Sequence, residues 1–293
     1  MLPNFLCVGA VKAGTTTLHH IIRQHPEVYL PNCKETNFFV NDEYANGLTF
    51  YETKYFSKIK NEKVIGEITP KYLYYDSVPE RIFESLGPNV KLIFIFRNPV
   101  HRAYSQYLMQ LRTGCETNTF EKALELESNR LSELTLPGVR DRYNYIDGGL
   151  YFKHLKKFLR IFDINNMLFL MFEELIVDPK ITFEKVAHFL DIRPYSKMDF
   201  NIKSNVAQKP KYQLLWKFAF REDCFTRIKQ LGKFVITNET VRRKIMDNIG
   251  SFSLEPMQVP EMNEKTRVNL KSIYKSDINE LEQFLKISLA HWK

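Results

Sequence analysis

The sequence of 293 residues lacks the features that mark membrane, secreted and disulfide-rich proteins. Its four cysteines show no C-x-x-C spacing and no dense framework, so we expect reduced thiols. No apolar stretch approaches the roughly 20 residues of a membrane span. The N-terminus has no basic segment ahead of an apolar one, which excludes a typical secretory signal. These absences favour a cytoplasmic protein.

Internal repeats, low-complexity segments and Gly/Ser/Pro-rich linkers are also missing, so we expect one domain over residues 1–293. The composition is that of an ordinary globular protein, with 44% hydrophobic and 26% charged residues. The net charge of +8 favours an anionic partner. Because the basic residues are spread along the chain, a small polyanion explains this balance at least as well as nucleic acid. We therefore expect no nucleic-acid partner, and the sequence does not indicate an oligomeric state.

Apolar runs and helical periodicity alternate over the first two thirds of the chain, which predicts a three-layer α/β/α fold with a central parallel sheet. The sheet core covers about residues 4–192, and a helical portion covers about 195–293, including a predicted helix over 212–231. Strands are expected at 4–9, 28–30, 63–69, 90–97 and 167–172, and helices at 15–24, 49–60, 78–86, 99–113, 119–131, 149–162 and 180–190.

The stretch FLCVGAVKAGTTTLHHII (5–22) has the pattern of a strand, a phosphate-binding loop and a helix. Glycines at 9 and 14 let backbone N–H groups converge on an anion at the helix N-terminus. Lys12 adds a compact positive charge. Ala13 and Gly14 complete the loop, and the hydroxyls of Thr15, Thr16 and Thr17 follow at the start of the helix.

A second candidate phosphate site follows the fourth predicted strand, in LIFIFRNPVHRAYSQY (92–107). Arg97 closes the strand, and Ser105 lies roughly 9 Å along the next helix. An arginine and a serine so placed can clamp one phosphate at the ligand-binding edge of a parallel sheet.

The order of lysine and glycine argues against a nucleoside triphosphatase. That loop reads G-x-x-x-x-G-K-[ST], whereas Lys12 precedes Gly14. No convincing strand ends in an aspartate that could hold magnesium.

Together these two stretches resemble the sulfotransferases that use 3′-phosphoadenosine 5′-phosphosulfate (PAPS), in which a K-x-G-T-T loop binds the phosphosulfate and an R-x7-S pair binds the 3′-phosphate. HPEVYLPNCKETNFF (25–39) and GEITPKYLY (66–74) are similar to segments of the heparan-sulfate-modifying and bacterial branch. GGLYFKHLKKFL (148–159) and LFLMFEELIVDPKITFEKVAHFLDI (168–192) extend the resemblance. It covers about residues 4–192.

The resemblance implies in-line sulfuryl transfer in which Lys12 meets the charge that grows on the leaving phosphate, with PAPS as donor and no metal. It implies that Glu35 of KETNFF is the catalytic base. The pKa of a hydroxyl exceeds that of a carboxylate by about 11 units, so Glu35 would accept the proton only as the S–O bond forms. A different sulfotransferase branch uses histidine, which leaves His20 and His25 as distant alternatives.

Several further assignments complete these expectations. Many relatives have a lysine where this chain has Ile68, and Lys71 or Lys34 could replace it. Phe39 and Tyr72 could wall an acceptor pocket together with Lys71. Lys203 and Lys209 of the basic loop NIKSNVAQKPK (201–211) could reach a phosphate.

The expected function is sulfuryl transfer to a hydroxyl, or to an amine, of a small-molecule, carrier-bound or sugar acceptor. The alternatives are a nucleotide kinase, which the position of Lys12 disfavours, and a non-catalytic nucleotide-binding module, which Glu35 disfavours. The sequence does not identify the acceptor.

Overall fold

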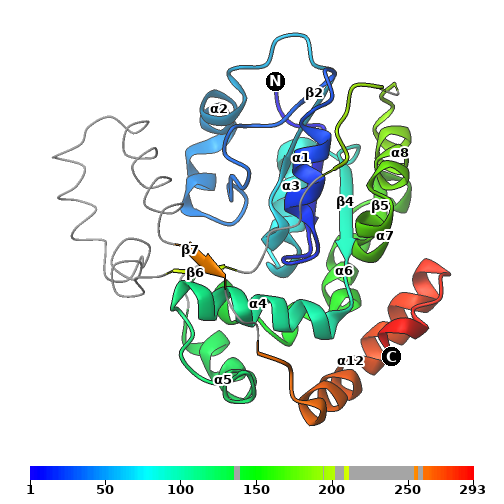
Figure 1. Ribbon diagram of the computed structural model, residues 1–293. Coiled ribbons are helices and arrows are strands. Elements are labelled where there is room, and N and C mark those ends of the chain that lie inside the picture. The colour runs from blue at the N-terminus through cyan, green and yellow to red at the C-terminus, as the bar shows by residue number, and fades with distance from the viewer. Residues whose placement is uncertain (135–138, 194, 202–207, 211–253, 257–259) are drawn as a thin grey trace.

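A computed structural model describes residues 1–134, 139–193, 195–201, 208–210, 254–256 and 260–293 (Figure 1). Its central sheet contains five parallel strands in the order β2-β3-β1-β4-β5. The strands are β1 (Phe5–Gly9), β2 (Val28–Tyr29), β3 (Val64–Ile68), β4 (Lys91–Phe96) and β5 (Met167–Met171). The α/β fold predicted from the alternating pattern is confirmed.

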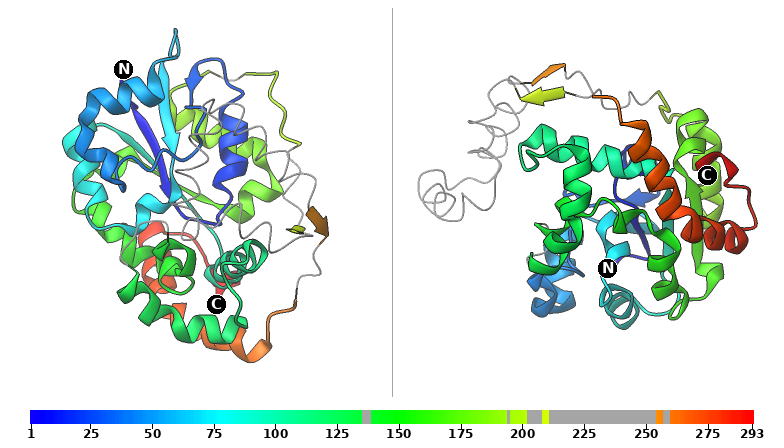
Figure 2. Two further views of the ribbon diagram at one scale, coloured as in Figure 1. Left: turned by 90° about the vertical axis from the view of Figure 1, so that its left-hand side faces the viewer. Right: turned by 90° about the horizontal axis from the view of Figure 1, so that it is seen from below.

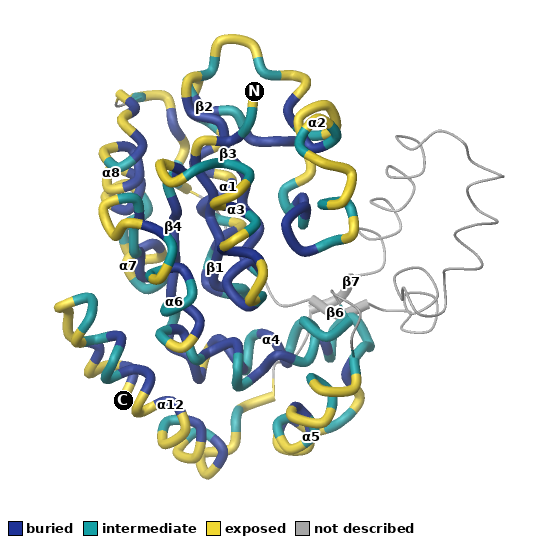
Figure 3. The backbone as a smooth tube through the Cα atoms, turned by 180° about the vertical axis from the view of Figure 1, so that it is seen from behind, coloured by how far each residue is buried: buried dark blue, intermediate teal, exposed yellow. Residues whose placement is uncertain are grey.

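The strand order places β1 at the centre of the sheet, between β3 and β4. All five residues of β1 are buried, as are five of the six in β4 (Figure 3). Continuous apolar runs form these strands because both faces of a parallel sheet are covered by helices. After β1 the chain adds β2 and β3 on one side of that strand, and later adds β4 and β5 on the other side. The loop after β1 therefore lies at the point where the strand order reverses, which is where open α/β sheets bind ligands.

Helices cover both faces of the sheet (Figure 2). On one face α1 contacts α8. On the other face α3 contacts the segment just after α6, where the ring centres of Phe83 and Phe162 lie 5.8 Å apart. The helices beside the sheet are α1 (Thr15–Ile22), α3 (Val78–Leu86), α6 (Tyr151–Leu159), α7 (Phe172–Val177) and α8 (Pro179–Leu190). Helices α4 (Pro99–Thr113) and α5 (Phe120–Glu133) lie across the end of the sheet (Figure 1).

Short helical turns connect these elements. The predicted helix 49–60 is divided, because α2 (Gly47–Tyr51) passes into a π-helical turn, η2 (Glu52–Phe56). The 3-10 turns are η1 (Asp42–Asn46), η3 (Pro70–Tyr74), η4 (Arg140–Tyr143), η5 (Asp147–Gly149), η6 (Ile164–Asn166) and η7 (Ala290–Trp292).

The C-terminal portion adds one long helix, α12 (Glu264–Leu285), which packs against α6 and α4. Asp277 of α12 accepts hydrogen bonds from the backbone N–H groups of Phe152 and Lys153, at 3.0 and 2.8 Å, in the first turn of α6. The region also contains an antiparallel pair, β6 (Gln208–Pro210) and β7 (Leu254–Pro256), which the predicted helical portion did not include. The predicted helix over 212–231 lies outside the described residues, and the assignment of one domain stays a prediction.

Candidate active site

The loop between β1 and α1 bends through two left-handed residues, Lys12 (φ 68°) and Gly14 (φ 90°). A side chain at Gly14 would place its Cβ 2.7 Å from a ring carbon of Phe172, so only glycine fits there. The first N–H groups of α1 have no acceptor within the helix, and a bound anion can accept from them. The K-x-G-T-T sequence thus forms an anion cradle.

Two hydrogen bonds from other parts of the chain hold this loop. The backbone N–H of Val11 donates to the hydroxyl of Tyr74, at 3.1 Å, and that hydroxyl donates to the carbonyl of Gly148, at 3.2 Å. The N–H of Ala10 donates to the carbonyl of Ile95 in β4, at 2.8 Å. The loop is therefore tied to the sheet and to η5.

Arg97 follows β4 and contacts the same loop. Its Nη1 donates to the carbonyl oxygen of Lys12, at 3.1 Å, and its guanidinium lies 4.4 Å from the ring centre of Phe172. The backbone carbonyl of Arg97 accepts from the hydroxyl of Tyr151, at 2.7 Å. Asn98 then caps α4 by accepting from the backbone N–H groups of Val100 and His101, and so fixes the start of the helix that carries Ser105.

One pocket of about 610 Å³ contains both predicted phosphate sites. Its wall includes the candidate groups Lys12, Gly14, Thr15, Thr16, Thr17, Lys34, Glu35, Lys71, Arg97 and Ser105. Segments that are distant in the sequence thus meet at one edge of the sheet. Ala13, also a residue of this loop, is fully buried and its side chain does not line the pocket.

Lys12 is the cation most affected by its surroundings. Burial, and secondarily the positive charges of Arg112, Arg97 and Arg102, lowers its pKa to about 8. Its Nζ lies 3.4 Å from the sulfur of Met109, which is a weak acceptor. A buried ammonium with several cations near it and no carboxylate partner in the described structure favours the binding of an anion.

Glu35 lies on the pocket wall and pairs with its neighbour, Lys34, through Oε1 and Nζ at 2.6 Å. The side chain of Glu35 is 38% exposed, so solvent or an acceptor can reach it. Neither alternative base, His20 or His25, lines this pocket. The ring of His25 bonds instead to the carbonyl of Arg193, at 2.8 Å.

Lys71 also lines the pocket and pairs with Asp141, at 3.2 Å. Phe39 and Tyr72, predicted as acceptor walls, are fully buried and do not line the pocket. They pack on each other within an aromatic cluster behind it, with ring centres 5.6 Å apart. Lys203 lies outside the described residues. Lys209 belongs to β6, whose backbone contacts α4, and its side chain is not described.

Ile68 is fully buried in β3, so this position supplies packing. The preceding residue, Glu67, is also fully buried and accepts a hydrogen bond from the hydroxyl of Thr36. Burial raises the pKa of Glu67 to about 7. Glu67 thus holds the residue after Glu35 in place through the hydroxyl of Thr36.

Several pocket residues carried no sequence signal. Gln106, Met109 and Gln110 lie on α4 beyond Ser105, where helical spacing from Ser105 could have indicated Met109. Asp141 and Arg142 arrive through η4, and Phe172 and Ile176 through α7, and no pattern in the sequence marks these residues. Among the described residues, no group of three or more histidine, cysteine, aspartate or glutamate side chains could hold a metal. The described wall therefore offers several cations and two carboxylates, Glu35 and Asp141, each of which pairs with a lysine.

A parallel α/β sheet with an anion cradle after its central strand defines a binding protein for phosphate-like ligands. The sulfotransferase domain family matches residues 2–217, and the chain belongs to this family of enzymes. The prediction drawn from the K-x-G-T-T and R-x7-S motifs is thereby confirmed at the level of the family.

Relatives in three groups share parts of the chain. It is 33% identical to human heparan sulfate glucosamine 3-O-sulfotransferase 3B1 over 66% of its own length and 47% of that protein. It is 40% identical to the membrane-associated sulfotransferase kil1 of Dictyostelium discoideum over 36% of its length and 22% of that protein. A sulfotransferase structure from Alicyclobacillus acidocaldarius has the same fold, with a TM-score of 0.73, 24% identity, and coverage of 100% of this chain and 99% of that one.

The chain spans about half the length, or less, of the curated relatives it matches first. No helix in the described ranges is long and apolar enough to cross a bilayer. A cytoplasmic location stays a prediction.

Proposed function

We propose that this protein transfers a sulfuryl group from PAPS to a hydroxyl or amine of a sugar, a small molecule or a carrier-bound acceptor. The observation that supports the donor is the shared pocket, where Lys12 and the threonines stand beside Arg97 and Ser105. A nucleotide with phosphate groups at both its 5′ and 3′ positions needs two such anion sites. The family resemblance assigns the loop to the 5′-phosphosulfate and the Arg97–Ser105 pair to the 3′-phosphate.

The donor supplies an activated sulfuryl group, and the protein supplies position and charge. In the proposed site Lys12 and the N–H groups at the start of α1 bind the 5′-phosphate and stabilise the charge that grows there. Arg97 binds the 3′-phosphate through its guanidinium, and Ser105 adds a hydroxyl donor. In this proposal each of the two phosphates of the nucleotide faces hydrogen-bond donors that the fold already holds in place.

Glu35 is the proposed base because it is a solvent-accessible carboxylate on the wall of the same pocket. It would accept the acceptor's proton while the new S–O bond forms. The ammonium of Lys34, 2.6 Å from Oε1 of Glu35, holds this carboxylate at the pocket wall. Lys71 remains a candidate contact for the acceptor because it lines the same pocket.

The names of the relatives indicate which acceptor class to test first. One is named a heparan sulfate glucosamine 3-O-sulfotransferase, so a sugar hydroxyl is the acceptor to test first. Small-molecule and carrier-bound hydroxyls belong in the same test. A screen with a donor carrying radiolabelled sulfate reports transfer to any of them.

Calorimetry tests the donor assignment without an acceptor. The protein should bind 3′,5′-adenosine bisphosphate without magnesium and more tightly than it binds ATP. Lys12→Ala and Arg97→Ala should each weaken that binding. Preference for ATP with magnesium would contradict the proposal and favour a kinase.

The proposed base is tested separately. Glu35→Gln should leave bisphosphate binding intact and lower turnover at least a hundredfold, which is the usual range for a general base. The matched control is Glu84→Gln, at an exposed position on α3 away from the pocket. Unchanged turnover in Glu35→Gln would remove the base assignment but not the donor assignment.

A further inference from the structure

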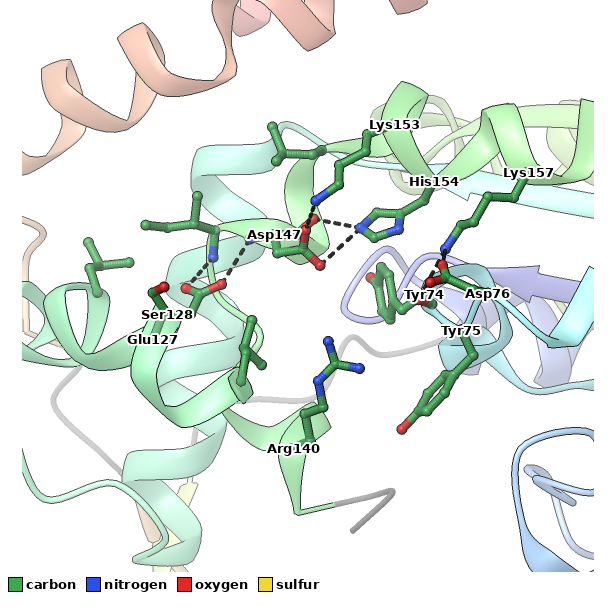
Figure 4. Close-up of a pocket in the computed structure, with 14 residues that line it drawn as sticks. Tyr74, Tyr75, Asp76, Glu127, Ser128, Arg140, Asp147, Lys153, His154 and Lys157 are labelled. Carbon is green, nitrogen blue, oxygen red and sulfur yellow. Dashed lines mark hydrogen bonds and ion pairs between the residues drawn. The ribbon is translucent and has the colours of Figure 1, made fainter. Parts of the chain in front are cut away.

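A second pocket, of about 500 Å³, lies outside the nucleotide pocket (Figure 4). Side chains from α5, η4, η5 and α6 and the segment 74–76 surround it. Its size is within the range of small-molecule sites. None of its wall residues belongs to the wall of the nucleotide pocket.

Most charged groups in this second pocket already have partners. Lys153 pairs with Asp147 at 2.6 Å, and Lys157 pairs with Asp76 at 3.0 Å. The ring of His154 contacts Asp147 through Nε2, at 3.1 Å. Glu127 accepts from the backbone N–H groups of residues 146 and 147, at 2.6 and 2.9 Å. The described carboxylates of the second pocket are thus engaged by these partners, and the charge of Arg140 acts on Asp76 without an ion pair between them.

Arg140 is the exception. The described structure gives it no ion pair, and its Nε is buried without a hydrogen-bond partner. In Figure 4 its guanidinium points from η4 into the space that Tyr74, Tyr75 and Asp147 border. A buried donor without an acceptor costs free energy, so an anion in this space would stabilise the arrangement.

The rest of the wall is apolar enough to hold a hydrocarbon body. Leu124 and Leu131 of α5 face the pocket together with Leu150, and the aromatic rings of Tyr74 and Tyr75 add to this surface. An arginine beside such a surface matches a ligand with one charged head group and an apolar chain or ring.

We propose that the second pocket binds an amphipathic organic monoanion, with its carboxylate or sulfate on Arg140 and its apolar part against the three leucines. The site is separate from the nucleotide pocket because side chains stand between them. Tyr75 donates to Asp141 at 2.7 Å, and Asp141 pairs with Lys71, which lines the nucleotide pocket. The proposal therefore does not depend on the donor or on the transfer reaction.

Calorimetry of the whole chain with octanoate tests the proposal, with octan-1-ol as the uncharged counterpart. Octanoate should bind at one site and more tightly than octan-1-ol. Each methylene added from butanoate to octanoate should raise the affinity about two- to fourfold. Saturating 3′,5′-adenosine bisphosphate should not displace octanoate, since displacement would place the probe in the nucleotide pocket and overturn the proposal.

Two variants and one control locate the site. Arg140→Gln should weaken octanoate binding about ten- to a hundredfold, as expected for loss of a charged hydrogen bond. Ser128→Trp, at an exposed position on the pocket rim, should block the pocket without disturbing the core. Arg160→Gln, at the exposed end of α6, should change nothing.

Octanoate binding to these variants either supports or overturns the proposed site. Loss of binding in both pocket variants, with unchanged thermal unfolding, supports the site. Full octanoate binding in Arg140→Gln, or equal binding of octan-1-ol, overturns the role of Arg140 and with it the proposed ligand class.

Discussion

Arg97 and Lys12 are joined directly, by a hydrogen bond of 3.1 Å from the guanidinium of Arg97 to the carbonyl oxygen of Lys12. The bond links the end of β4 to the loop after β1. Lys12 has a left-handed backbone, which a non-glycine residue adopts only when its surroundings hold it. Arg97 thus fixes the loop that carries Lys12, and in the proposed site it would also bind a phosphate.

This double contact predicts that lysine cannot replace Arg97. Arg97→Lys keeps the charge but loses the planar group that stacks on Phe172 and reaches Lys12. We expect Arg97→Lys to weaken the binding of 3′,5′-adenosine bisphosphate at least tenfold, close to the loss in Arg97→Ala. Calorimetry measures both, with Arg160→Lys as the exposed control; wild-type affinity in Arg97→Lys would show that charge alone suffices.

The low pKa of Lys12, about 8, predicts how nucleotide binding depends on pH. Below pH 8 the free protein carries a charged Lys12, and above it the amine is neutral. The affinity for 3′,5′-adenosine bisphosphate should therefore fall as the pH rises through 8, by up to tenfold per pH unit. Lys12→Arg should remove this dependence because arginine stays charged. Calorimetry between pH 7 and 9.5 tests the prediction, and identical profiles for the two proteins would contradict it.

The same buried charge should lower the stability of the free protein. The unfolded chain keeps Lys12 protonated up to the ordinary lysine range, whereas the folded chain pays a desolvation cost. We expect Lys12→Met to raise the free energy of unfolding by about 1–3 kcal/mol at pH 7 while it abolishes bisphosphate binding. Urea unfolding measures this. A destabilised Lys12→Met protein would mean that Lys12 supports the fold.

Glu67 offers a separate test of stability against pH. Burial raises its pKa to about 7, so between pH 4.5 and 7 the folded state holds a proton that the unfolded state releases. Its contribution is complete below pH 4.5 and is lost as the pH rises to 7. The unfolding free energy of the wild type, taken relative to Glu67→Gln, should fall by about 1–3 kcal/mol across this range. Urea unfolding of Glu84→Gln at each pH is the control, and a flat difference for Glu67→Gln would refute the assignment.

Much of the fold was predictable because buried parallel strands leave a continuous apolar run in the sequence. Strand β4 and the helix after it were predicted almost to the residue. The divided helix at 47–56 was not, because periodicity alone does not distinguish an α-helix from a π-helical turn. The pair of β6 and β7 is too short, and too far apart in the sequence, to leave a pattern.

The site shows the same limit. Lys12 and Arg97 were predictable because each follows an apolar strand and belongs to a motif with fixed spacing, K-x-G-T-T for Lys12 and R-x7-S for Arg97. The position of Phe39 and Tyr72 behind the wall depends on how β3, η3 and the segment after Glu35 pack together, which a sequence does not specify. The sequence likewise does not indicate that the hydroxyl of Tyr74 contacts the loop 63 positions earlier.

That hydroxyl leads to the last prediction. In Tyr74→Phe the backbone N–H of Val11 loses its acceptor, and the carbonyl of Gly148 loses its donor. Because the loss of such a part-buried hydrogen bond costs about 0.5–1.5 kcal/mol, the loop should lose its fixed bend next to Lys12. We expect the affinity for 3′,5′-adenosine bisphosphate to fall about tenfold.

The control for Tyr74→Phe is Tyr29→Phe, which removes a hydroxyl bonded to the carbonyl of Tyr55 at 3.0 Å, away from the pocket. Both variants should lose stability, and Tyr74→Phe should lose more because its hydroxyl makes two hydrogen bonds and that of Tyr29 makes one. Only Tyr74→Phe should lose nucleotide affinity, and it should do so without the altered pH profile expected of Lys12→Arg. Equal affinity in the two variants would mean that the bend at Lys12 does not need the hydroxyl of Tyr74, and that the bond from Arg97 to the carbonyl of Lys12 and the backbone bonds of Ala10 are enough to hold it.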